Sequence, residues 1–138
     1  MREWLVFDVM GVIFTVGDDT NELLVTNVQK FAPSLTSDEI NQAYLEASLG
    51  KVASCGFWKT LGLGDRYPQI EQDYLESQLT LDADFPAVAQ KLQKDYHLAL
   101  LSNDVSEWSA YLRKKYDLNF EVKSFKQLPG LVAHLFGV

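Results

Sequence analysis

Two short apolar runs stand out along the chain, one near the N-terminus and one at about residue 100. Residues 5–7 are apolar throughout, and residues 97–101 are apolar after His97. Runs of this length without alternating polar residues are typical of strands buried on both faces of a parallel sheet. We therefore predict two buried parallel strands here, and a third strand over residues 120–124.

Between the two runs, apolar residues recur at the spacing of a helix face. The predicted helices cover residues 21–31, 36–50, about 57–61 and 68–79. Thr36 and Glu39 have the spacing of a capping box, and Gly50 is a typical residue just after a helix C-terminus. Residues 18–80 are therefore predicted to form an all-helical insertion directly after the first strand.

After this insertion, the pattern returns to alternating strands and helices. Asp84 and Asp104 each precede an amphipathic stretch, and we interpret both aspartates as helix N-caps. The order strand–helix–strand–helix–strand implies right-handed crossovers and a parallel sheet. The expected fold class is α/β, with a shortened Rossmann-like parallel-sheet core from residues 1–17 and 81–138 and a helical cap from residues 18–80.

Composition and charge narrow the classes of function. The chain has 138 residues, and 47% of them are apolar, which suits one packed globule. The formal net charge of −7 argues against a nucleic-acid partner. The apolar runs fall well short of the roughly 20 residues of a membrane span, and no signal-peptide pattern opens the chain. The single cysteine excludes an internal disulfide and fits a reducing cytosol, so we expect a cytoplasmic protein with no membrane partner.

The candidate chemistry lies in the polar residues that end the two apolar runs, because strand ends face the ligand crevice in open α/β sheets. Asp8 ends the first run, and Ser102 and Asn103 end the second. We interpret Asp8 as a nucleophile or metal ligand, because a carboxylate beside an apolar strand is costly without a role. Its alternative is an Asx-type turn before Gly11. Ser102 and Asn103 are candidates for binding a phosphate or carboxylate, with local capping as their alternative.

The strand–Asp-x-x-Gly-Val pattern over residues 5–12 and the Leu-Leu-Ser-Asn run over residues 100–103 together resemble the haloacid dehalogenase superfamily. The resemblance covers residues 1 to about 118. It implies that Asp8 is the catalytic nucleophile and that Ser102 is the catalytic hydroxyl of the second motif. Family members of this type carry a cap domain over the active site where this chain has its helical insertion.

The resemblance also implies substrate contacts and a catalytic lysine. Gly11, Val12 and Asn103 would bind the substrate, and Gly11 would let the backbone turn sharply and expose its amides. Lys123 would be the lysine of the third motif, which neutralises charge at the nucleophile. No proline follows Lys123, as one usually does in the family, so a solvated strand lysine is the alternative.

Metal binding is expected to be weak. In the family, Mg²⁺ is held by the nucleophile, by a carbonyl two residues on and by an acid of a fourth motif; here the first two would be Asp8 and the carbonyl of Met10. No Asp or Glu follows Glu121, so the fourth motif is absent and the chain resembles a truncated or degenerate family member. A hard cation with so few oxygen ligands is expected to bind weakly or not at all.

Met10 stands where family phosphatases carry a second aspartate as general acid and base. Methionine cannot transfer protons, and family dehalogenases carry tyrosine at this position. The pattern over residues 7–12 is therefore nearer to the dehalogenase form than to the phosphatase form. The alternative is a methionine that only fills a gap in the core.

These observations favour a hydrolase that acts through an aspartyl nucleophile on a small phosphorylated or halogenated metabolite. The alternative is a non-catalytic remnant that serves as a binding or assembly module.

By resemblance, the missing fourth-motif strand would have covered the edge of strand one. An open edge over residues 4–7 recruits another strand, so we expect a homodimer, with residues 131–138 folding back onto the edge as the alternative.

Overall fold

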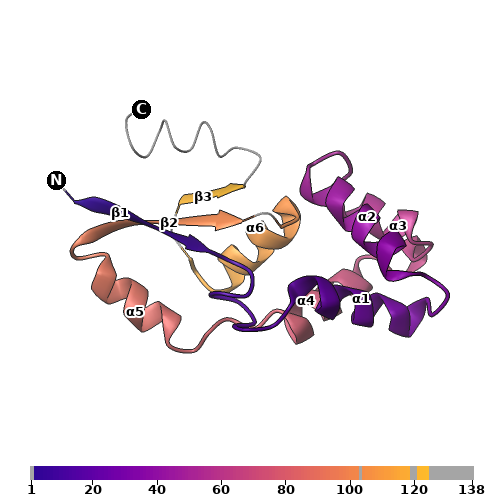
Figure 1. The fold of residues 1–138 in the computed structure, drawn as a ribbon, viewed down its shortest axis with the longest axis horizontal. Coiled ribbons are helices and arrows are strands. Elements are labelled where there is room, and N and C mark those ends of the chain that lie inside the picture. Colours follow the sequence, from indigo (N-terminus) through magenta and orange to yellow (C-terminus); the bar gives the residue numbers. More distant parts are fainter. Residues whose placement is uncertain (1, 103, 119–120, 125–138) are drawn as a thin grey trace.

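A computed structural model describes residues 2–102 and 104–118, together with the strand at 121–124 (Figure 1). This part of the chain is mixed α/β. Its elements are β1 Glu3–Asp8, α1 Thr20–Phe31, α2 Ser37–Ser48, α3 Ser54–Thr60, the 3₁₀ helix η1 Gly64–Arg66, α4 Gln69–Gln78, α5 Phe85–Leu92, β2 Tyr96–Ser102, α6 Ser106–Lys115 and β3 Glu121–Ser124. The three predicted strands and the helical stretch after the first are confirmed, except that residue 120 lies outside the described residues.

The described strands form a parallel sheet in the order β1-β2-β3, which confirms the predicted strand direction. Asp8 pairs with Leu101, and Leu101 pairs with Lys123. The backbones of these three residues therefore lie on one rung at the carboxyl edge of the sheet. Among the strands that the structure describes, β1 pairs only with β2, so its outer edge is open.

The two faces of the sheet differ in how they are packed. The face toward α5 and α6, which lie on the same side of the sheet, carries Leu5, Phe7, Leu98 and Leu100 (Figure 1). On the opposite face, Trp4 and Leu101 pack around Ala99 in a separate small cluster, and Val6 is 38% exposed. The expectation that strand one is buried on both faces is therefore wrong, because β1 is an edge strand whose second face is only partly covered in the described part of the chain.

The helical segment from α1 to α4 gathers at one end of the molecule (Figure 1). Local capping fixes both ends of α2 as predicted, and it also fixes the start of α1. The Thr36 hydroxyl accepts the N–H of Glu39, and the Glu39 carboxylate accepts the N–H of Thr36 at 2.8 Å. Gly50 follows α2 with a φ of 75°, a conformation that favours glycine, and its N–H donates to the carbonyl of Ala47. The carboxylate of Asp19 accepts the first amides of α1.

Of the two N-caps predicted after the insertion, Asp84 occupies the N-cap position of α5 without making a capping bond, and the prediction for Asp104 is wrong. At α5, Oδ1 of Asp82 accepts the N–H of Asp84 at 2.8 Å and that of Phe85 at 3.1 Å, whereas Asp84 makes no side-chain cap bond. The cap is thus an Asx turn that begins two residues earlier. At α6, Val105 occupies the N-cap position and offers no side-chain cap, and the side chain of Asp104 is buried instead.

The helical segment and the sheet layer share one hydrophobic core. Trp108 of α6 is 1% exposed and lies among four aromatic rings of the helical segment. Centroid distances from Trp108 run from 5.3 to 6.3 Å to the rings of Tyr44, Phe57, Trp58 and Tyr74. The division into a cap of residues 18–80 and a separate core stays a prediction.

Candidate active site

Asp8 ends β1 at the carboxyl edge of the sheet, and its side chain is exposed. Within the described residues, its carboxylate takes part in no hydrogen bond or ion pair. The Asx-type turn is not formed among the described residues, because the Asp8 carboxylate accepts no amide there and the Gly11 N–H donates to the carbonyl of Phe14. The sequence argument for a nucleophile was the cost of burying an unpaired carboxylate, and the exposure of Asp8 removes that argument. The structure instead favours this interpretation because the carboxylate is accessible at the end of a strand.

The loop after β1 is a tight turn that uses its own amides. Gly11 has a φ of +77°, while a Cβ there would come only to 3.5 Å from the carbonyl of Asp18. Backbone conformation rather than crowding therefore requires glycine. The Gly11 N–H donates to the carbonyl of Phe14 at 2.8 Å, so the expectation that this amide is exposed for substrate is wrong. The side chain of Val12 is 47% exposed on the loop beside Asp8.

Ser102 ends β2, and its side chain is 4% exposed. Its Oγ accepts the N–H of Asp104 at 3.1 Å and lies 3.5 Å from Oγ of Ser109 on α6. Because side chains alternate along a strand and Asp8 pairs with Leu101, Ser102 faces the opposite side of the sheet from Asp8. The structure places these two candidate catalytic residues at one edge without bringing their side chains together, and local turn formation accounts for the bond that Ser102 makes to Asp104.

Two further candidates are only partly described. Asn103 lies outside the described residues. The backbone of Lys123 lies in β3 opposite Leu101, on the same rung as Asp8. This spacing is about 10 Å between backbones, twice the distance between adjacent strands. The side chain of Lys123 is outside the described part of the chain.

Few donors for Mg²⁺ surround Asp8. The residues that the structure describes contain no group of three or more His, Cys, Asp or Glu side chains that could hold a metal ion. The carbonyl of Met10 accepts none of the loop's backbone hydrogen bonds, and the Met10 side chain packs, partly buried, against the main core. One carboxylate and one carbonyl leave most of the six positions around Mg²⁺ to water. These two oxygen donors are too few to define a magnesium site, and weak Mg²⁺ binding stays a prediction.

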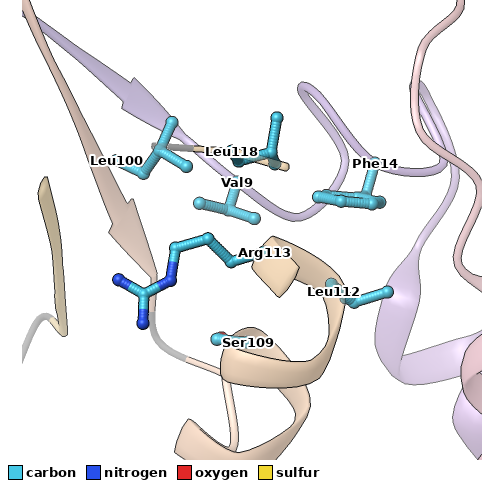
Figure 2. A pocket seen from close by; sticks show the side chains of 7 residues that line it. All are labelled: Val9, Phe14, Leu100, Ser109, Leu112, Arg113 and Leu118. Atoms are coloured by element: carbon cyan, nitrogen blue, oxygen red, sulfur yellow. The ribbon is translucent and has the colours of Figure 1, made fainter. Parts of the chain in front are cut away.

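A small crevice opens between the loop after β1, strand β2 and helix α6 (Figure 2). Its lining is mostly apolar and consists of Val9, Phe14, Leu100, Ser109, Leu112, Arg113 and Leu118. The crevice encloses about 10 Å³, which is room for at most one water. Figure 2 shows the guanidinium of Arg113 turned away from Phe14. The crevice is therefore too small to hold a metabolite.

Among the described residues, Asp104 is the carboxylate whose pKa is shifted most, and the sequence pattern did not reveal this shift. The Tyr44 hydroxyl donates to Oδ1 of Asp104 at 3.0 Å. Burial raises the pKa of Asp104 from 3.8 to about 6, while the Val105 amide and the Tyr44 hydroxyl stabilise the charged form and limit the rise. Burial also raises the pKa values of Tyr44 and Tyr74, and the nearby Asp104 charge raises them further.

Comparisons with known proteins add no family assignment. No protein-family model matches the chain, and no curated protein matches it. In the described part of the chain, no helix combines the length and apolar character needed to cross a bilayer. The resemblance to haloacid dehalogenases therefore depends on the motif residues themselves, and chiefly on Asp8.

Proposed function

We propose that this chain is a haloacid-dehalogenase-like hydrolase that uses Asp8 as its nucleophile on a small halogenated or phosphorylated metabolite. The observation that carries the proposal is the exposed Asp8 carboxylate, which ends a parallel strand and is engaged by no described group. A nucleophile must reach its substrate, and a carboxylate held by a turn could not do so without first breaking its bonds.

The chemistry available at Asp8 favours leaving groups that depart without a proton. An oxygen of Asp8 would attack the carbon or phosphorus centre, form an ester or an acyl phosphate respectively, and expel the leaving group with its electron pair. Water would then hydrolyse this intermediate and restore the carboxylate. Met10 cannot protonate a departing alkoxide, so halide or an acidic phenol suits this site better than an ordinary alcohol.

The arrangement of the elements supports the same proposal. A parallel sheet with α5 and α6 on one side is consistent with a shortened Rossmann-like core. The helices α1 to α4 follow β1 directly, where the family carries its cap. The backbone of Lys123 shares the rung of Asp8, which is the place for a lysine that neutralises charge at the nucleophile.

The rival function is a non-catalytic binding or assembly module. The observation that favours it is the sparse site: one uncommitted carboxylate, a crevice of about 10 Å³, and a Ser102 hydroxyl already used within the fold. A remnant of this kind would keep the fold and its surfaces without turnover.

The test uses the full chain with two substrates, 2-bromopropanoate and para-nitrophenyl phosphate. We expect release of bromide or nitrophenolate by the wild type, and loss of that turnover in Asp8→Asn with an unchanged circular dichroism spectrum. Asp18→Asn is the matched control, because Asp18 is another exposed carboxylate on the same loop. Wild-type turnover in Asp8→Asn would refute the nucleophile, and a wild type inactive on both substrates would favour the binding module.

A further inference from the structure

Asp104 is a buried carboxylate whose hydrogen bonding is incomplete. The residue is 6% exposed, and it follows β2 by two positions. Oδ1 accepts the hydroxyl of Tyr44, whereas Oδ2 is buried with no hydrogen-bond partner among the described residues. A buried charge that is only partly hydrogen-bonded raises the free energy of the folded protein. The carboxyl group of Asp104 therefore favours either the protonated form or contact with water.

The groups around Asp104 come from different layers of the molecule. Tyr44 belongs to α2 and is 60 positions earlier in the chain. Tyr74 belongs to α4, and Trp108 belongs to α6, with a centroid distance of 5.3 Å between their rings. Tyr44 and Trp108 are also in ring contact, at 6.0 Å. The carboxylate therefore sits where the helical segment is packed against the loop that leaves the sheet.

We propose that the buried Asp104 carboxyl is a pH-operated latch. It keeps α2 and α4 packed against the carboxyl edge of the sheet while it is protonated, and this packing loosens when it ionises, because the hydrogen bond from Tyr44 only partly offsets the cost of burying the charge. The proposal does not depend on hydrolysis at Asp8. It concerns how firmly the helical segment is closed over the strand ends.

The sign follows from the surroundings of Asp104. Burial raises its pKa from 3.8 to about 6, so the closed form holds its proton to a higher pH than an open, solvated form does. The titratable groups that face it are Tyr44 and Tyr74, whose pKa values burial raises, so both stay neutral. Among the described residues, the single ion pair joins Lys51 to Glu46, so no cation pairs with Asp104. Closure is therefore strongest below about pH 4, weakens as pH rises through about 6, and is constant above that.

The latch is connected directly to the candidate site. The N–H of Asp104 donates to Oγ of Ser102 at 3.1 Å, so the carboxylate and the end of β2 belong to one turn. Ionisation that draws Asp104 toward water would loosen this turn as well as the packing of Tyr44. The molecule would then open its strand ends at neutral pH and close them in mild acid.

Hydrogen exchange measured by mass spectrometry tests the latch, with protection factors corrected for the intrinsic effect of pH. From pH 4 to pH 7.5, we expect protection of the α2 amides in the wild type to fall by about sixtyfold, the change that corresponds to a carboxylate pKa of about 6 when closed and 3.8 when open. Asp104→Asn keeps the shape and an acceptor for Tyr44 but cannot ionise. Its protection should not change with pH. The exposed Asp95→Asn is the matched control and should behave as the wild type.

A second variant keeps the test decisive if Asp104→Asn does not fold. Tyr44→Phe preserves the ring but removes a hydrogen bond that stabilises the ionised carboxylate, so the fall in protection should move to a higher pH. The latch is refuted if wild-type protection of α2 is constant from pH 4 to 7.5. It is also refuted if Asp104→Asn shows the wild-type fall, or if the midpoint in Tyr44→Phe is unchanged or lower.

Discussion

Replacing Trp108 with alanine tests whether one buried ring holds the helical segment to the sheet layer. Trp108 is 1% exposed, and its ring contacts four aromatic rings from α2, α3 and α4. We expect Trp108→Ala to lower the free energy of unfolding by about 3–5 kcal/mol, from lost apolar burial and the cavity left behind. Domains have a total stability of about 5–15 kcal/mol, so this variant should be only marginally folded.

Trp108→Phe separates the packing of the ring from its polar edge. The indole Nε1 is buried and has no hydrogen-bond partner in the described part of the chain. Phenylalanine keeps much of the ring contact and removes a donor whose burial costs about 1–3 kcal/mol. The two effects oppose each other, so we expect a net loss of less than about 2 kcal/mol.

Urea unfolding followed by far-ultraviolet circular dichroism measures both variants. With a slope of about 2 kcal/mol per molar urea, Trp108→Ala should shift the midpoint down by about 2 M, and Trp108→Phe by less than half of that. Val88→Ala is the control, because Val88 is 46% exposed on α5 and its truncation should change stability by no more than about 0.5 kcal/mol. A Trp108→Ala midpoint equal to that of Val88→Ala would refute the central role of this ring.

Two further predictions concern the start of α5 and the edge of the sheet. Asp82→Ala should lower the free energy of unfolding by about 0.5–2 kcal/mol, because it removes the side chain that caps α5. Asp84→Ala should change the free energy of unfolding by less than about 0.5 kcal/mol. Equal losses of the two variants in urea unfolding would contradict this assignment. Light scattering at micromolar concentration should report a dimer or larger species, because β1 has an open edge among the described strands; a monomer would speak against pairing through β1.

Elements fixed by neighbouring residues could be predicted from the sequence. The capping box of Thr36 and Glu39 and the glycine after α2 each need partners within a few positions, and the structure has them as expected. The strands β1 and β2 could be predicted from their apolar runs, and their parallel order from the helices between them. Asp84 occupies the predicted N-cap position of α5, but Asp82 accepts the amides, because both are suitable cap residues and only the backbone path decides which side chain makes the bonds.

The candidate site was less accessible to sequence reasoning, because it depends on which way each side chain faces. Asp8 and Ser102 end adjacent strands, yet the register offsets them by one residue and so directs them to opposite faces. The amide of Gly11 is used within its own turn, a detail of loop closure that no spacing reveals. The hydrogen bonding of Asp104 depends on Tyr44, which lies 60 positions earlier in the chain and could not be paired with it from the sequence.

Asp8 and Asp104 show how similar positions acquire different roles. Asp8 ends one apolar strand and Asp104 follows the next, but the Asp8 carboxylate is exposed and bonded to no described group, whereas Asp104 is buried and bonded to Tyr44. Attack on a substrate needs an accessible carboxylate, which only Asp8 provides. Sensitivity to mild acid needs a carboxylate that loses hydration on closure, which only Asp104 provides of the two. Hydrolysis lost in Asp8→Asn alone, and pH-dependent protection lost in Asp104→Asn alone, would assign catalysis and closure to separate residues of one strand edge.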